Sequence, residues 1–115
     1  MTEAAVPETP ETLVAADLAR LAERNPAPAG GVSPALAHRG EGVQIRQIAF
    51  DAGAVLSEHT APRPIVVHVL DGSIAFRVED RVHELGTGGV LHVPAGVRHE
   101  VTARRPARIT VTLLG

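Results

Sequence analysis

Residues 53–72 of the chain read GAVLSEHTAPRPIVVHVLDG, and residues 88–99 read GGVLHVPAGVRH. Both stretches hold short apolar runs between glycines and prolines, a pattern typical of short strands joined by turns. One histidine stands in the middle of the first stretch, His59, and one ends the second, His99. The two stretches therefore predict short strands joined by turns, with His59 in the first stretch and His99 at the end of the second.

Outside these stretches, apolar residues also recur at every second position, as in strands with one buried face. A type I′ turn needs positive φ at both central residues, and Asp71-Gly72 is the strongest hairpin signal of this kind. Glu79-Asp80 predicts a second tight turn. Many short strands after one helix indicate an all-β sandwich or barrel. Strands are predicted at 43–50, 65–70, 74–79, 81–85, 90–93, 97–103 and 108–114.

The chain before residue 43 has a different character. Residues 1–8 read as a disordered tail, and residues 9–42 as an N-terminal helix and linker arm. Thr9-Pro10 has the form of a helix N-cap followed by proline, and apolar spacing predicts a helix over 10–24. The linker is rich in Pro, Gly and Ala, with one short strand expected near 35–38. Residues 43–115 are the predicted β-barrel.

Composition excludes several classes of function. The 115 residues suit one domain, and they contain no Cys, which excludes disulfides and thiol chemistry. They also contain no Lys, which excludes Schiff-base chemistry. The net charge of -2 does not indicate the basic surface that binding to nucleic acid requires. No apolar run approaches the roughly 20 residues of a membrane span, and the N-terminus lacks a secretory signal, so we expect a cytoplasmic protein.

The two quoted stretches resemble the paired motifs of the cupin superfamily, and the chain is similar to a small single-domain cupin. Fixed positions of the two motifs are matched by Gly53, His59, Gly72, Gly88, Pro94, Gly96 and His99. The resemblance covers about residues 43–114. It implies a double-stranded β-helix, or jelly-roll, barrel with a short N-terminal helix. The resemblance specifies a fold and leaves the reaction open, because this family hosts many reactions and also non-enzymes.

The resemblance also implies a metal site, and here the chain departs from the family pattern. The second histidine position is Ala61, the glutamate position is Ile65, and the asparagine position is Ala103. Only His59 and His99 are left as ligands for Zn, Fe, Mn or Ni. Two neutral imidazoles without a carboxylate hold a divalent ion weakly, because the site supplies no negative charge. We therefore expect either no metal or a weakly bound one.

A ligand pocket is predicted around the two histidines. Ala61, Ile65 and Val67 give it hydrocarbon walls, which suits a small, partly apolar molecule. Arg63 lies between Ala61 and Ile65 and is expected at the mouth. Arg46 shares strand parity with core-facing residues. An arginine placed there binds a carboxylate with a bidentate fork.

Three hypotheses follow from these residues. The first is a cupin with a degenerate metal site that binds a small molecule in the barrel. The second is a metal-dependent enzyme of isomerase or dioxygenase type that uses His59 and His99, with help from water, substrate or His38. The third is a non-catalytic dimerisation scaffold. In each, the expected partners are a small-molecule ligand and a second copy in a homodimer, with no nucleic acid and no membrane.

Overall fold

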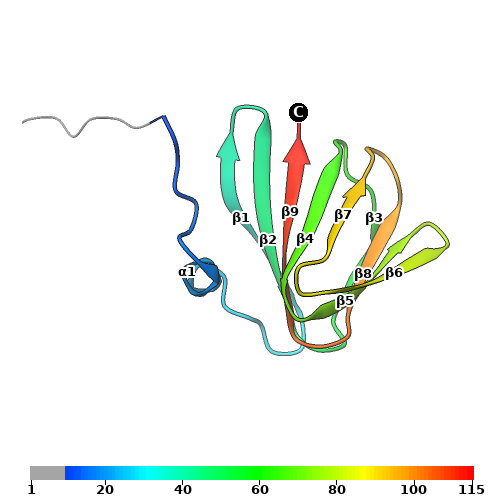
Figure 1. The fold of residues 1–115 in the computed structure, drawn as a ribbon. Coiled ribbons are helices and arrows are strands. Elements are labelled where there is room, and N and C mark those ends of the chain that lie inside the picture. Colours follow the sequence, from blue (N-terminus) through cyan, green and yellow to red (C-terminus); the bar gives the residue numbers. More distant parts are fainter. Residues whose placement is uncertain (1–9) are drawn as a thin grey trace, which may run out of the picture.

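The computed structural model describes residues 10–115, which form two antiparallel β-sheets and one short helix (Figure 1). The predicted tail at 1–8 and the proposed cap Thr9 lie outside this range. Sheet A has the strand order β1-β2-β9-β4-β7, and sheet B the order β3-β8-β5-β6. The elements are α1 (Leu18–Glu23), β1 (Val32–Gly40), β2 (Val43–Phe50), β3 (Val55–His59), β4 (Ile65–Asp71), β5 (Ser73–Val78), β6 (Arg81–Gly86), β7 (Val90–Val93), β8 (His99–Ala103) and β9 (Ala107–Leu114). The predicted all-β jelly roll with a short N-terminal helix is confirmed.

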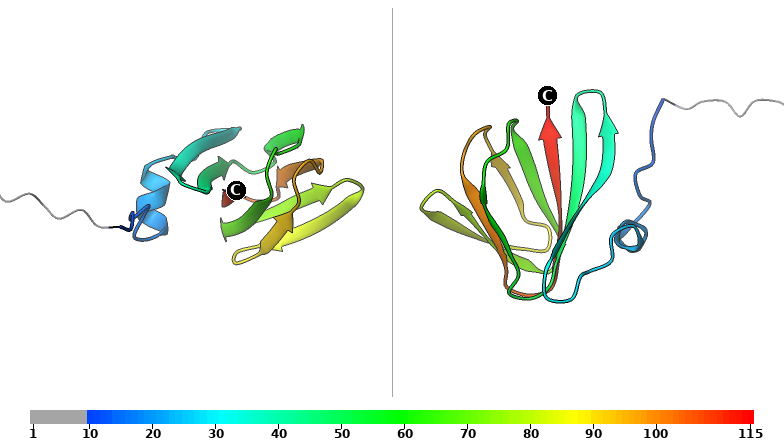
Figure 2. Two further views of the ribbon diagram at one scale, coloured as in Figure 1. Left: turned by 90° about the horizontal axis from the view of Figure 1, so that it is seen from above. Right: turned by 180° about the vertical axis from the view of Figure 1, so that it is seen from behind.

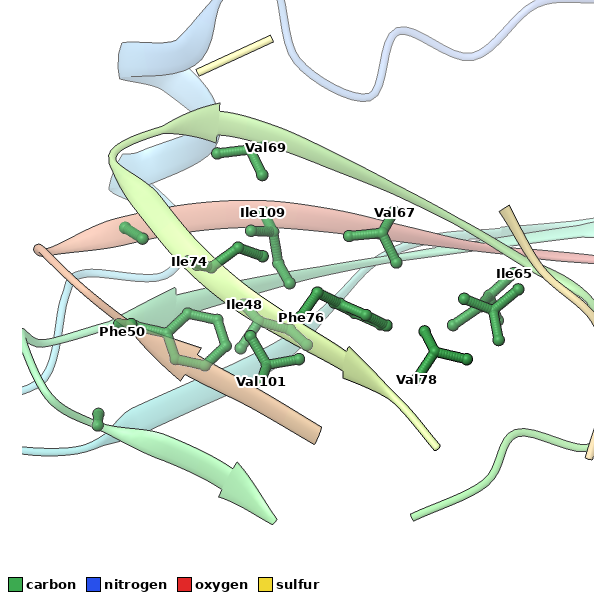
Figure 3. Packing of buried hydrophobic residues seen from close by; sticks show 14 residues of the cluster. Ile48, Phe50, Ile65, Val67, Val69, Ile74, Phe76, Val78, Val101 and Ile109 are labelled. Carbon is green, nitrogen blue, oxygen red and sulfur yellow. The ribbon is translucent and has the colours of Figure 1, made fainter. Parts of the chain in front are cut away.

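The hydrophobic core lies between the inner faces of the two sheets (Figure 3). Alternate residues of each strand point inward, which is why the sequence period of two produced this layering. Sheet A contributes fully buried aliphatic side chains to this core. Sheet B contributes Phe76 and Val101. The sheets lie close together at one end and spread apart at the other, where β9 ends (Figure 1). Figure 2 shows the same opening from behind.

The turn at Asp71-Gly72 is present, but the predicted hairpin is wrong. β4 belongs to sheet A and β5 to sheet B, so this turn passes the chain from one sheet to the other. Gly72 has φ 89, and a Cβ there would collide with the carbonyl oxygen of Pro106. The hairpin lies instead at Glu79-Asp80, between the paired strands β5 and β6, with Glu79 at φ 54.

The predicted helix over 10–24 is too long. The helix spans Leu18–Glu23, and its N-cap is Asp17, whose carboxylate accepts the backbone N–H of Arg20 at 2.8 Å. Leu21 is the only buried residue of the helix, and Leu18 is 41 % exposed. A helix with so little buried apolar surface gains little from tertiary packing, so it extends no further than its cap supports. No helix in residues 10–115 has the length and apolarity to cross a membrane.

A buried polar network holds the helix against the outer face of sheet A. Gln47 donates from Nε2 to the carbonyl of Leu21 at 2.8 Å, and its Oε1 accepts from Arg108 at 2.8 Å. Asn25 donates from Nδ2 to the backbone carbonyl of Ser33, and the Ser33 hydroxyl donates to Oδ1 of Asn25, both at 2.7 Å. These bonds satisfy polar groups that would otherwise be costly to bury, and they tie the N-terminal arm to the barrel.

The sheet begins at Val32 and not at the predicted boundary of residue 43. β1 is a full strand paired with β2, and it is longer than the short strand expected near 35–38. A β-bulge interrupts this pairing between Leu36 and His38. One extra residue reverses the alternation of side chains beyond it. As a result, Arg39 pairs with Gln44 and lies on the inner face of the sheet.

Candidate functional site

The spread end of the barrel contains a cavity of about 770 Å³. Both sheets line it. Sheet B contributes His59, His99 and Phe76, and sheet A contributes Arg46 and Ile65 among others. A cavity of this volume is within the range of small-molecule sites, which combine apolar walls with a few polar groups.

The two histidines meet inside this cavity, as the sequence predicted. β3 and β8 are paired, and His59 lies opposite His99 in the register. A β-bulge lies between Leu56 and His59. It shifts the alternation of side chains, so Leu56 and His59, three residues apart, both point toward the cavity. The Nε2 atoms of the two histidines are 3.1 Å apart, and the rings make an edge contact with centroids 4.2 Å apart. Phe76 stacks against His99 with centroids 5.4 Å apart.

Backbone carbonyls set the tautomers of both rings. Nδ1 of His59 lies 2.8 Å from the carbonyl of Ser57, and Nδ1 of His99 lies 3.0 Å from the carbonyl of Val97. A carbonyl only accepts, so each Nδ1 carries the proton and donates it. In the neutral form of both rings, the two Nε2 atoms are then bare acceptors that converge on one point. A hydrogen-bond donor or a cation placed there would relieve their mutual repulsion.

Burial controls the protonation of His99. Its side chain is 2 % exposed, and this desolvation lowers the pKa of the ring. The hydrogen bond to the Val97 carbonyl opposes the shift, and the nearby His59 adds to it. The ring is therefore held neutral, as an acceptor at Nε2, over a wider range of pH than an exposed histidine.

The residues present do not fit the metal site of the family pattern. Among residues 10–115, no three His, Cys, Asp or Glu side chains are grouped so that they could hold an ion. Ile65, at the glutamate position, is 2 % exposed and belongs to the hydrophobic core (Figure 3). Ala61 packs against that core. Glu58 adjoins His59, but its carboxylate is held on the other side of the strand by Arg77 at 3.0 Å.

The remaining histidines do not complete the pair. His38 lies on the outer face, where its Nε2 packs against Gly40, so its suggested help to a metal is wrong. His68 and His92 are exposed on the outer face, as expected from alternation. The interpretation of His83 as an outer-face residue is wrong. His83 pairs with Phe76 and therefore lies on the inner face at the edge of sheet B.

Six of the seven residues predicted for the pocket line the cavity, namely Arg46, His59, Ala61, Arg63, Ile65 and His99. Val67 does not. It is fully buried, between Leu91 and Val111 in the register, and its side chain lies in the core below the cavity. Arg46 shares the inner face with Ile48, but it is exposed at the mouth and not buried in the core.

Two polar residues of this face were missed. Gln44 lines the cavity and lies two residues from Arg46 on the same face of β2, so strand parity alone would have found it. Arg39 lies opposite Gln44 because of the bulge in β1. A bulge leaves no clear mark in residues 32–40, and strict alternation across it assigns Arg39 to the wrong face.

Comparison with known proteins agrees with this architecture. A family model described as Cupin domain matches residues 46–113, which is more than half of the chain. The chain belongs to the cupin family. No curated protein was found to match it.

Solved cupin structures resemble the chain over most of its length. A cupin superfamily protein from Desulfitobacterium hafniense is 23% identical, with a TM-score of 0.74 over 82% of this chain and 86% of that one. KdgF from Halomonas sp. is 18% identical, with a TM-score of 0.70 over 78% and 84% of the two chains. An RmlC-like cupin from Desulfovibrio desulfuricans is 28% identical, with a TM-score of 0.68 over 72% and 81%. These likenesses establish the cupin fold and leave the ligand open.

Proposed function

We propose that this cupin binds a small, partly apolar molecule in the barrel and does so without a tightly held metal. The observation that carries the proposal is the replacement of ligands by hydrocarbon beside an open cavity. His59 and His99 converge there, while Ile65 and Ala61 occupy the positions of a carboxylate and a third imidazole. Apolar walls with two fixed acceptors favour a ligand that has a hydrocarbon body and a hydrogen-bond donor.

Adjacent residues at the end of β9 provide a matched test. Leu113 lines the cavity, whereas Leu114 is 40 % exposed and does not line it. Benzyl alcohol and 2-phenylethanol are suitable probes, because each joins an apolar ring to a hydroxyl donor. We expect both to shift amide resonances of β8 and β9 in two-dimensional NMR. Leu113→Trp should reduce these shifts by placing an indole in the cavity, and Leu114→Trp should retain them.

Two results would contradict binding in the barrel. One is the absence of any shift in the native protein at millimolar probe. The other is retention of the shifts in Leu113→Trp, which would place the probes elsewhere on the surface. Normal thermal unfolding of both tryptophan variants is the control that the fold is intact.

Metal-dependent catalysis is the second candidate, and one observation favours it. The 3.1 Å separation of the two Nε2 atoms is short enough for both to contact one ion. Elemental analysis of protein purified without a histidine tag separates the two candidates. A stoichiometric ion that disappears in the double variant His59→Ala, His99→Ala would support the enzyme. Substoichiometric metal in the native protein would support the metal-free pocket.

A role as a scaffold alone is less well supported. That hypothesis predicts a barrel filled with side chains, whereas this barrel contains a cavity of about 770 Å³. Homodimerisation is compatible with ligand binding, and we keep it as part of the proposal because β1 and β7 are sheet edges open to pairing. Sedimentation velocity at several protein concentrations tests it, and a single monomeric species throughout would contradict it.

A further inference from the structure

The arginines of this chain divide into two groups. Eight of the eleven form an ion pair or a side-chain hydrogen bond within residues 10–115, and three do not. The three without such a partner are Arg39, Arg46 and Arg63. The guanidinium group has five donors and stays charged, so each of these three side chains is available to bind an anion.

These three arginines gather at one place, around the cavity mouth on sheet A. Arg46 lies opposite Val111 in β9, and Arg39 lies opposite Gln44 one row further toward the mouth. Arg63 comes from the loop before β4, where its side chain lies against Gly115 just after β9. The three therefore flank the end of β9 from both sides, and two of them, Arg46 and Arg63, line the cavity itself.

No free acidic group in the lining balances this charge. Glu58 is the only Asp or Glu among the lining residues. Arg77 bonds its carboxylate at 3.0 Å, and Arg98 contacts it at 3.5 Å. The pKa of Glu58 is lowered, chiefly by the hydrogen bond from Arg77, so the carboxylate stays ionised to lower pH than a free glutamate, and the two arginines compensate its charge. The charges of Arg46 and Arg63 therefore have no free carboxylate to balance them among the lining residues.

Gln44 gives a second, independent sign of a ligand. It is 9 % exposed, and its amide has no hydrogen-bond partner in the described part of the chain. No fully enclosed side-chain nitrogen or oxygen there lacks a partner, so the Gln44 amide must reach open space. The open space beside it is the cavity, which Gln44 lines. A nearly buried amide that faces a cavity between arginines is a donor for a ligand oxygen.

We propose that the ligand of this cupin is an organic carboxylate, held by Arg46, Arg63 and Gln44 at the mouth with its hydrocarbon body in the barrel. Arg39 adds charge at the rim and steers the anion inward. Below the mouth, the walls of sheet A are aliphatic, and those of sheet B include Phe76 and Val101. This inference rests on the proposed binding function and specifies its ligand class.

Matched pairs of probes separate the contribution of the carboxylate to binding from that of the hydrocarbon. Hexanoate and hexanamide have the same chain, as do 3-phenylpropionate and 3-phenylpropanamide, and only the acids are charged. We expect each acid to bind about tenfold more tightly than its amide by NMR titration at low salt, because charge-assisted hydrogen bonds are stronger than neutral ones. The preference should shrink at 0.5 M NaCl, since the rim is open to screening.

Arginine variants locate the effect. Arg46→Gln and Arg63→Gln should each weaken hexanoate binding several-fold and leave hexanamide binding unchanged. Arg20→Gln is the matched control, because Arg20 lies on α1 at the outer face of sheet A, does not line the cavity and pairs with Glu23. Equal affinity of the native protein for acid and amide would overturn the carboxylate while leaving the proposed binding function standing. Equal losses in Arg20→Gln would also overturn it. Failure of acids, amides and alcohols alike would overturn both.

Discussion

The Nε2 atoms of His59 and His99 face each other at 3.1 Å, and a backbone carbonyl two residues earlier fixes the other nitrogen of each ring. When both rings are neutral, the pair therefore presents two acceptors to the cavity and no donor. Cupins with a full ligand set would place an ion at such a point. In this chain hydrocarbon adjoins the pair, and we therefore propose an organic ligand whose donor bonds to the paired nitrogens.

The pH dependence of stability should report on His99. Burial lowers its pKa, so the folded protein binds fewer protons at this ring than the unfolded chain. The free energy of unfolding should therefore fall as pH drops below about 6.5, the ordinary histidine value, and stop responding to this ring below its folded pKa. Urea unfolding from pH 7.5 to 5 measures this slope. His99→Gln should flatten it, and His68→Gln, on the exposed outer face, should not. Equal slopes in all three proteins would contradict the assignment.

Restoring the missing ligands should create a metal site. Ala61→His with Ile65→Glu places a second imidazole and a carboxylate beside His59 and His99. Without metal, the carboxyl group at the buried position 65 should lower stability by about 2 kcal/mol or more. Zn²⁺ or Ni²⁺ should restore the melting temperature, as thermal unfolding can show. Adding His59→Ala should remove this rescue, and rescue that persists would show that the ion binds elsewhere.

Gly72 should be far less tolerant of a side chain than Gly88, although both have φ 89. A Cβ at Gly72 meets the backbone of Pro106 and Ala107, whereas nothing lies within 4 Å of a Cβ at Gly88. Gly88→Ala should cost only the conformational strain, about 1 kcal/mol. Gly72→Ala should cost about 2–4 kcal/mol, because the crossing between the sheets must shift. Chemical denaturation measures both, and equal losses would contradict the close approach.

Two glutamines of β2 should differ sharply on substitution. Gln47 is 1 % exposed and its side chain bonds to Leu21 and Arg108, whereas the side chain of Gln44 has no hydrogen-bond partner in residues 10–115. Gln47→Ala should lower the free energy of unfolding by about 2–3 kcal/mol, because it leaves a buried guanidinium without its acceptor. Hydrogen exchange should also rise in α1. Gln44→Ala should have a much smaller effect on both readouts. Unchanged exchange in α1 of Gln47→Ala would show that other contacts hold the arm.

Most strand positions from β2 onward were predictable, because apolar residues recur with a period of two along these strands. The helix was overpredicted, since the spacing of Val14, Leu18 and Leu21 says nothing about whether a surface exists to bury them. The prediction of a hairpin at Asp71-Gly72 was wrong for a related reason. A glycine turn specifies local backbone conformation, and the choice of partner strand depends on the sheets on either side.

The amino-acid sequence by itself determined the cupin barrel, the meeting of His59 with His99, and the loss of the ligands at Ala61 and Ile65. These depend on strand alternation and on residue identity at fixed spacing, which are local properties. Only the tertiary structure decided that Arg39 joins the inner face and that three arginines at one mouth lack acidic partners. Both facts arise from a bulge and from pairing across strands far apart in the chain, and such long-range contacts have no local signature.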